Sequence, residues 1–279
     1  MERIKAAIEK AKKNQPGSGN SVHNNRHKTN ELDGSLSEEH HEAIEYNKTQ
    51  IVNLNQECLN NHRIVAFNKS NQNSVSFDLL RTQVLRLMKE NNWRTLAITS
   101  PEPEAGKTVV SINLAMSISQ QTDQTVMLVD FDLRRPKVMR YLGLDVDVSL
   151  NEVLENKNSV QDALINPNMP HLVILPVKAP VAKASEMLGS KKVKSLVNDL
   201  KNRYEDRIVI FDLPPILNLD DTLAVLPSID CVLLVIGNGM STHKDISESI
   251  QHLGDANLLG YVLNKAEEAA KGYYYAENK

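Results

Sequence analysis

The residues best suited to chemistry form one short segment, Thr99–Thr108, which reads Thr-Ser-Pro-Glu-Pro-Glu-Ala-Gly-Lys-Thr. It follows a predicted strand and opens a predicted helix, where backbone N–H groups and a helix N-terminus can hold phosphate groups. Lys107 would place a positive charge on the β- and γ-phosphates of a nucleotide, and Thr108 would offer a hydroxyl to magnesium. Pro101 replaces the first glycine of the usual pattern. A turn before an ordinary helix is therefore the alternative interpretation.

A second segment places two carboxylates and two guanidinium groups at the end of another predicted strand. Asp130-Phe-Asp-Leu-Arg-Arg-Pro136 puts Asp130 and Asp132 at i and i+2, so an extended backbone directs both to one side. They could share a magnesium shell and accept a proton, while Arg134 or Arg135 could stabilise developing phosphoryl charge. Capping of the strand end is the alternative for one of the two acids.

A third segment resembles the second in form. The apolar strand Arg207–Phe211 ends in Asp212, which is followed by Leu213 and two prolines. A carboxylate at this place would hold magnesium through a water molecule. The prolines would stiffen the loop that faces the γ-phosphate.

The elements that must position these residues alternate along the chain after Trp93. Six apolar segments are predicted to be strands, and three amphipathic segments between them are predicted to be helices. The strands are Thr95–Thr99, Thr125–Phe131, His171–Pro176, Arg207–Phe211, Cys231–Ile236 and Leu258–Leu263, and the helices are Lys107–Gln120, Ser185–Tyr204 and Thr242–Leu253. This alternation predicts an α/β fold with a mainly parallel sheet covered by helices on both faces. Upstream, Arg63–Phe67 is predicted to be a short strand and Phe77–Lys89 a helix packed on the domain.

Composition restricts the classes of function. The 279 residues carry a formal net charge of −3, which gives no overall attraction to nucleic acid. Cys58 and Cys231 form neither a disulfide framework nor a zinc spacing. The apolar runs are shorter than the ~20 residues that span a bilayer, and no signal-peptide core is present at the N-terminus. A cytoplasmic protein is therefore expected.

The composition also divides the chain into four parts. Residues 1–14 are predicted to form a short basic amphipathic helix, either a docking helix for a membrane or partner or a frayed terminal helix. Residues 15–61 are predicted to be a flexible, disordered polar linker, because they contain too few apolar side chains to fold alone. Residues 62–268 are predicted to be the folded domain, and residues 269–279 a tail that bears tyrosines.

Together these motifs resemble those of the deviant Walker P-loop proteins and, among them, the bacterial tyrosine autokinases of exopolysaccharide and capsule assembly. The resemblance runs from about Arg63 to the C-terminus and includes a tyrosine cluster near the chain end. It implies a three-layer P-loop NTPase fold that uses ATP and Mg²⁺ to phosphorylate a tyrosine on another copy. The implied ATP-binding residues are Glu104, Ala105, Gly106, Lys107, Thr108, Val109 and Asn264; the magnesium residues Thr108, Asp130 and Asp212; the catalytic residues Lys107, Asp130, Asp132 and Arg134; and the phosphorylated residues Tyr273, Tyr274 and Tyr275.

Partners and location follow from the same resemblance. It implies a membrane-spanning polysaccharide co-polymerase or chain-length regulator as activator, which would recruit the chain to the inner face of the cell membrane. The resemblance also implies that the chain forms a homo-oligomer and that a tyrosine phosphatase acts on it. It implies no nucleic-acid partner. Asn264 could instead be a turn residue after a strand, and the tyrosine cluster could pack on the domain or on a partner.

The loop departs from the family pattern at two positions. Glu104 stands in place of a glycine and Ala105 in place of a glutamate, so Glu102 and Glu104 lie near the expected triphosphate. If position 104 needs a positive φ, its side chain costs ~1–3 kcal/mol in strain.

The helix upstream departs from the family pattern as well. The family often carries Glu-x-x-Arg-x-x-Arg there, which pairs subunits in a ring. The aligned residues here are Val75, Asp78 and Arg81. The ring interface is therefore not supported by these residues.

Two other functions share the fold. A Min- or Par-type positioning ATPase would carry the second and third motifs. Members of that class resemble each other in having a lysine five positions before the loop lysine, whereas this chain has Glu102 there. A catalytically weak, nucleotide-dependent regulatory partner of a polysaccharide co-polymerase would tolerate both departures.

Overall fold

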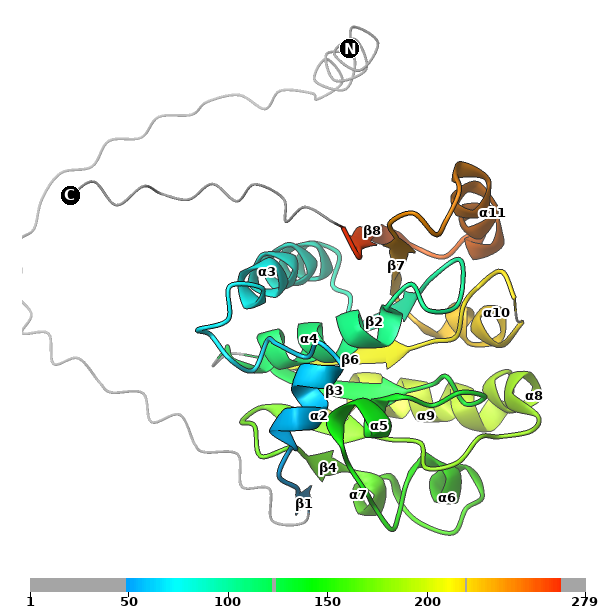
Figure 1. The fold of residues 1–279 in the computed structure, drawn as a ribbon. Coiled ribbons are helices and arrows are strands. Elements are labelled where there is room, and N and C mark those ends of the chain that lie inside the picture. Colours follow the sequence, from blue (N-terminus) through cyan, green and yellow to red (C-terminus); the bar gives the residue numbers. More distant parts are fainter. Residues whose placement is uncertain (1–48, 122–123, 219, 267–279) are drawn as a thin grey trace, which may run out of the picture. The chain divides into compact units, whose positions relative to one another are not determined.

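The computed structural model describes residues 49–121, 124–218 and 220–266, and its described strands form one sheet (Figure 1). The strands are β1 (Gln50–Ile51), β2 (Thr95–Thr99), β3 (Thr125–Asp130), β4 (Ile165–Asn166), β5 (Leu172–Leu175), β6 (Arg207–Asp212), β7 (Cys231–Gly237) and β8 (Leu258–Asn264). Their order across the sheet is β1-β4-β5-β3-β6-β2-β7-β8. Every neighbouring pair is parallel except β4 and β5, which are antiparallel. The predicted mainly parallel sheet is confirmed.

Helices cover both faces of this sheet. They are α2 (Gln56–Asn61), α3 (Ser74–Glu90), α4 (Lys107–Ser119), α5 (Val138–Leu142), α6 (Leu150–Leu154), α7 (Val160–Ala163), α8 (Ala184–Leu188), α9 (Lys191–Asn202), α10 (Asp221–Val225), the 3₁₀ turn η1 (Leu226–Ser228) and α11 (His243–Leu253). Helices α2 to α5 pack on one face, and α6 to α11 pack on the other.

Alternate residues of each central strand enter the two cores. In β2, Leu96 and Ile98 join the core under α2 to α5, whereas Ala97 joins the core under α6 to α11. In β6, Ile210 joins the core under α2 to α5, and Phe211 joins the core under α6 to α11. This period of two explains why the central strands read as continuous apolar runs, since both of their faces are buried.

Helix α3 is fastened to α4 by a polar cluster rather than by apolar contact alone. The carboxylate of Asp78 accepts hydrogen bonds from Arg81 Nη1 at 2.8 Å and from Ser117 Oγ at 2.6 Å. Arg81 Nη1 also donates to the carbonyl oxygen of Ser117 at 3.0 Å. Two of the three positions aligned with the subunit-pairing motif therefore bind within their own chain.

Most predicted elements occur within one or two residues of their expected bounds, but two predictions are wrong. Ser185–Tyr204 is not one helix: it divides into α8 and α9, because the Ser190 side chain caps a new helix by accepting from Val193 N. Arg63–Phe67 is not a strand, since Arg63 has φ 57° and the amide N–H groups of Val65 and Ala66 donate to a side chain of α4.

The start of the folded part also differs from the prediction. Strand β1 pairs with β4, and Leu59 of α2 is buried, so ordered structure is present before the expected linker boundary at residue 61. The predicted helix at 1–14, most of the linker and the tail at 269–279 lie outside the described residues.

None of the helices in the described ranges is both long and apolar enough to cross a membrane.

We predict that Asp78→Ala lowers the free energy of unfolding by about 1–2 kcal/mol, because it removes the carboxylate that accepts from both Arg81 and Ser117 between two packed helices. Urea denaturation of the full chain measures this change.

The matched control is Glu90→Ala, which removes an exposed ion pair with Arg86 from the same helix. It is expected to change stability by less than about 0.5 kcal/mol. Equal effects of the two substitutions would show that the cluster does not fasten α3.

Candidate active site

The candidate site lies where three adjacent strands end. Strand β6 sits between β3 and β2, and all three are parallel, so their carboxyl ends meet at one edge. Asp130 and Asp212 are register partners at that edge. The loop that follows β2 leads into α4 through Gly106. Three motifs far apart in the sequence therefore converge, as expected for ligand sites of open α/β sheets.

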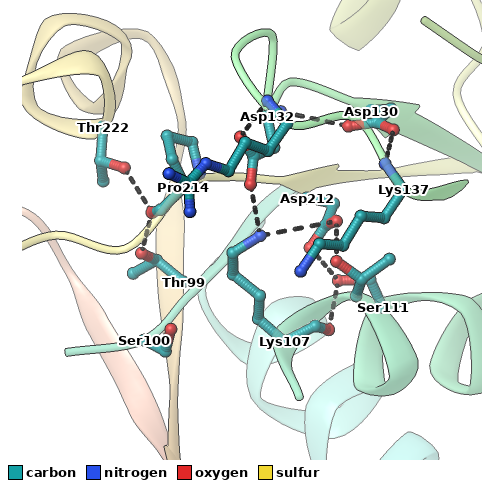
Figure 2. A network of polar contacts seen from close by, with 12 residues as sticks. Thr99, Ser100, Lys107, Ser111, Asp130, Asp132, Lys137, Asp212, Pro214 and Thr222 are labelled. Carbon is teal, nitrogen blue, oxygen red and sulfur yellow. Dashed lines mark hydrogen bonds and ion pairs between the residues drawn. The ribbon is translucent and has the colours of Figure 1, made fainter. Parts of the chain in front are cut away.

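A buried ion pair joins the phosphate-binding loop to the second motif. Lys107 Nζ lies 2.8 Å from Asp132 Oδ2 and 4.0 Å from Asp212 Oδ2 (Figure 2). Burial lowers the pKa of Lys107, but the charges of Asp212 and Asp132 outweigh this effect, so its pKa is above the ordinary value. The ammonium group therefore stays charged. Lys107 is only 6% exposed, so it faces carboxylates and not open solvent.

Thr108 and Asp212 present hard oxygen ligands side by side. Thr108 Oγ1 donates to Asp212 Oδ2 at 2.6 Å, and Ser111 Oγ donates to Asp212 Oδ1 at 3.0 Å. Burial raises the pKa of Asp212, although Lys107 and the Thr108 hydroxyl oppose the shift. No group of three or more His, Cys, Asp or Glu in the described ranges could hold a metal ion by itself. A hydroxyl and a carboxylate fit magnesium, which usually takes its other ligands from water and substrate phosphates.

Asp130 organises the backbone of the second motif. Its Oδ1 accepts from Asp132 N at 3.1 Å, and its Oδ2 accepts from Lys137 N and Val138 N at 3.1 Å each. Burial, followed by the charge of Asp212, raises its pKa well above the ordinary range. Because both oxygens already accept backbone hydrogen bonds, Asp132 is the carboxylate of this motif that reaches Lys107. The roles of Asp130 as magnesium ligand and base stay predictions.

The two arginines of the motif differ in their surroundings. Arg134 Nε and Nη2 donate to the two oxygens of Asp221 at 2.7 and 3.0 Å. Asp221 is fully buried at the start of α10, so the pair links the motif to that helix. Arg135 is exposed. The predicted catalytic guanidinium of Arg134 is therefore held by a carboxylate of its own chain.

The loop after β6 is tied to the strand that carries the phosphate-binding loop. The carbonyl oxygen of Pro214 accepts from Thr99 Oγ1 at 2.6 Å and from Thr222 Oγ1 at 2.7 Å (Figure 2). Ile216 N donates to the carbonyl oxygen of Ser100 at 2.9 Å. Hydrogen bonds thus fix the loop beyond Asp212.

The phosphate-binding loop requires glycine at one position and tolerates its absence at another. Gly106 has φ 95°, and a Cβ there would lie 2.0 Å from Asn264 Nδ2. Asn264 Nδ2 in turn donates to the carbonyl oxygen of Ala105 at 2.9 Å. Glu104 has φ 65°, so the positive φ considered for this position is confirmed. Glutamate is strained in this backbone conformation, whereas glycine would adopt it without strain.

A cavity of about 700 Å³ opens beside the loop. Predicted residues that line it include Glu104, Gly106, Lys107, Thr108, Val109 and Asn264. Asp130, Asp132 and Asp212 are not among the lining residues, but Asp132 contacts Lys107 and Asp212 contacts Thr108. The predicted acceptors Tyr273, Tyr274 and Tyr275 lie outside the described residues.

Sequence reasoning missed a further set of cavity residues. Arg63, Phe77, Lys137, Tyr141 and Lys265 also line it. Lys137 follows Pro136 directly, so extending the second motif by one residue would have found it. Tyr141 stacks on His62 at 4.4 Å between ring centroids, and burial raises its pKa. The other residues had no local signal, because the fold alone brings them to the loop.

Comparison with known proteins agrees with this geometry. A family model described as an AAA domain matches residues 93–256. Tyrosine-protein kinase YwqD of Bacillus subtilis is 31% identical over 207 residues, covering 72% of this chain and 86% of that protein. Tyrosine-protein kinase etk of Escherichia coli K12 is 31% identical over 199 residues, covering 70% of this chain. The chain spans only 27% of the length of etk but most of the length of YwqD.

Solved structures give the same result. The kinase domain of the E. coli tyrosine kinase ETK has a TM-score of 0.61 and 30% identity, covering 68% of this chain and 76% of that one. The cell division ATPase MinD of Pyrococcus furiosus has a TM-score of 0.53 and 28% identity, covering 63% of this chain and 74% of that one. The architecture is thus shared by kinases and positioning ATPases, and the comparisons of sequence favour the kinases.

We predict that Asp212→Asn makes the stability of the chain less dependent on pH. The pKa values of Asp130 and Asp212 are raised in the folded state. At pH values between the pKa of the unfolded chain and that of the folded chain, the folded state therefore binds more protons than the unfolded chain. Their stabilising contribution is therefore greatest at acid pH and is lost as pH rises through the folded pKa. Urea denaturation between pH 4 and pH 8 without nucleotide should show a smaller fall for the variant than for the wild type.

The control is Asp255→Asn, a substitution at an exposed position. It is expected to leave the pH profile of the wild type unchanged. A profile for Asp212→Asn that is parallel to that of the wild type would contradict the charge crowding described above.

Proposed function

The chain belongs to the bacterial tyrosine-protein kinases within the AAA-domain proteins, and on this premise we propose that it transfers the γ-phosphoryl group of ATP to tyrosine hydroxyl groups. One observation carries the proposal: Lys107 and Thr108, at the start of α4, contact Asp132 and Asp212 at the ends of two adjacent strands. Phosphate binding, magnesium binding and proton acceptance thus occur within one constellation.

The residues of the loop bind and orient the triphosphate. The backbone N–H groups at the start of α4 and the ammonium group of Lys107 hold the β- and γ-phosphates. Thr108, and Asp212 through a water molecule, would hold Mg²⁺, which would neutralise charge on the phosphates. Positioning contributes most of the rate in phosphoryl transfer, because the protein forms no covalent intermediate.

A carboxylate beside Lys107 would take the proton of the tyrosine. In the transfer, the phenol oxygen bonds to the γ-phosphorus, the bond from that phosphorus to the bridging oxygen of ADP breaks, and the phenol proton passes to Asp132. A phosphate group that attracts Lys107 would draw it from Asp132 and leave a carboxylate oxygen to accept this proton. Asp130 keeps the backbone around Asp132 in place through the hydrogen bond from Asp132 N.

The tail and the partners belong to the same proposal. The acceptors are Tyr273, Tyr274 and Tyr275 of a second copy, so the chain acts at least transiently as a homo-oligomer. A membrane-embedded polysaccharide co-polymerase activates it and recruits it to the membrane, and a tyrosine phosphatase reverses the modification. Autophosphorylation then regulates polymerisation and export of an exopolysaccharide or capsule. Support comes from the family and from the family-like tyrosine cluster at the chain end.

A second candidate is a catalytically weak, nucleotide-dependent regulator. Two observations favour it: Arg81 binds within its own chain, where the family uses this helix to pair subunits, and Glu104 adds strain and negative charge beside the phosphates. A positioning ATPase is less well supported, because Glu102 stands where that class carries its lysine.

We predict that Lys107→Met removes phosphotyrosine from residues 273–275, because no ammonium group remains to hold the γ-phosphate. Phosphopeptide mass spectrometry of the full chain after incubation with ATP and Mg²⁺, with and without the cytoplasmic segment of the co-polymerase, measures the loss. Circular dichroism establishes that the variant folds.

Lys183→Met is the control, since that lysine forms an exposed ion pair with Glu186 far from the three motifs along the chain. It should retain wild-type phosphorylation. Phosphotyrosine that persists in Lys107→Met would contradict the proposed kinase. Absence of phosphotyrosine from the wild type with an activating partner, together with normal nucleotide binding, would favour the regulator.

Glu104 allows strain and charge to be separated. We predict that Glu104→Gln lowers the Kd for ATP about fivefold, because it removes a negative charge that lines the cavity. Glu104→Gly should lower the Kd equally and also raise the free energy of unfolding by about 1 kcal/mol, since glycine accepts a positive φ without strain.

Isothermal titration and urea denaturation provide the two measurements. Glu102→Gln serves as the control, because Glu102 is not among the residues that line the cavity. Unchanged ATP affinity in both Glu104 variants would show that this carboxylate does not oppose binding.

A further inference from the structure

Strained backbone is concentrated around the nucleotide cavity. Asn and His account for four of the seven non-glycine residues with positive φ in the described ranges, and these residue types adopt that conformation comparatively often. The other three are Arg63, Glu104 and Lys265, with φ of 57°, 65° and 59°. All three line the cavity. Strain of this kind persists where the surroundings enforce it, and it is commonly found at ligand sites.

Arg63 is the member of this set that lies upstream of the segment matched by the AAA-domain model, which covers residues 93–256. Its backbone is held by Asn113, a fully buried residue of α4. Asn113 Nδ2 donates to the carbonyl oxygen of Arg63 at 3.1 Å, and its Oδ1 accepts from Val65 N at 2.7 Å and from Ala66 N at 2.9 Å. The helix that begins at the phosphate-binding loop therefore fixes Arg63 as well.

The position of Arg63 around α4 indicates which end of a nucleotide it would meet. Thr108 directs its hydroxyl to Asp212, at the edge of the sheet where the proposed nucleotide site would hold magnesium and the terminal phosphates. Val109 follows Thr108 and also lines the cavity, and Asn113 Nδ2 donates to the carbonyl oxygen of Val109 at 2.9 Å. The residues that line the cavity thus include Lys107 and Thr108, which contact the carboxylates, and also Val109 and Arg63, which Asn113 joins one turn further along α4.

The chemistry of Arg63 suits this end of the cavity. The side chain is exposed, and its guanidinium group makes no hydrogen bond or ion pair with any of the described residues. In contrast, Lys107 is already paired with Asp132. Glu104 also adds a negative charge to the cavity wall, so a triphosphate needs further positive charge there. A guanidinium group binds phosphate oxygens with two parallel hydrogen bonds.

We propose that Arg63 binds the α-phosphate of the nucleotide at the nucleoside end of the cavity, and that Asn113 positions it by holding its backbone. The inference rests on the nucleotide site of the proposed function but not on phosphoryl transfer. It extends the binding site to a segment upstream of the three motifs.

Arg63→Gly removes the side chain and leaves a residue that adopts φ 57° without strain. Titration of the full chain with ATP and, separately, with ADP should show that both Kd values rise about tenfold, because both nucleotides carry the α-phosphate. The loss should shrink as NaCl is raised, since salt screens the charge. Thermal unfolding without nucleotide should be no lower than in the wild type.

Lys69→Gly is the matched control, because it removes a nearby exposed cation that does not line the cavity. It is expected to change either Kd by less than twofold. Wild-type affinity in Arg63→Gly would overturn the inference, and so would a loss that affects ATP but not ADP, because the contact would then be at the γ-phosphate.

The role of Asn113 is tested by a double-mutant cycle. Asn113→Ala should weaken binding of ADP in the wild-type background and have little further effect in Arg63→Gly, since it acts through that side chain. Equal losses in both backgrounds would contradict the positioning role.

Because the readout is nucleotide binding, the two proposals can fail separately. A chain that binds ATP through Arg63 but forms no phosphotyrosine would contradict only the kinase assignment. A chain that phosphorylates its tail and binds nucleotide equally well without Arg63 would contradict only this inference.

Discussion

One buried ammonium group, that of Lys107, faces the buried carboxylates of Asp130, Asp132 and Asp212. The excess of negative charge is reduced partly by raised pKa values and partly by hydrogen bonds from hydroxyl and backbone N–H groups. Such an arrangement costs stability in the free chain, because buried charges lose hydration that one cation cannot replace. A bound magnesium ion would add positive charge beside the carboxylates, and a triphosphate would bring oxygen ligands for that ion together with negative charge that Lys107 would meet, so binding and stability are coupled.

The rest of the edge keeps this cluster from relaxing. Asp130 ties down the backbone of residues 132–138, and the carbonyl oxygen of Pro214 is held by hydroxyl groups from two other segments. Arg134 is paired with Asp221 rather than free in the cavity. Each of these contacts fixes a loop at the end of a buried strand. Positioning of this kind is what phosphoryl transfer requires of a protein.

The phosphate-binding loop shows how far a motif can change while its conformation stays the same. Position 106 favours glycine because its φ is 95° and a Cβ there would also displace the Asn264 side chain, whereas position 104 keeps a left-handed conformation with glutamate. Arg63 and Lys265, also left-handed, bring positive charge to the same cavity. The acidic substitution and the basic residues are thus parts of one electrostatic balance, although they are far apart in the sequence.

The amino-acid sequence alone was enough to predict the parallel sheet, its central strands and the three motifs, because buried strands read as apolar runs and motif residues follow them directly. It could not determine that β6 lies between β2 and β3, which brings Asp132 and Asp212 to Lys107, since strand order depends on long-range packing. Nor could it place Arg63. The sequence predicts a strand there, but in the structure the N–H groups of Val65 and Ala66 donate to Asn113 Oδ1 and not to a neighbouring strand. Local patterns encode elements and their ends; only tertiary contacts, made across dozens of residues, decide which side chains share a cavity.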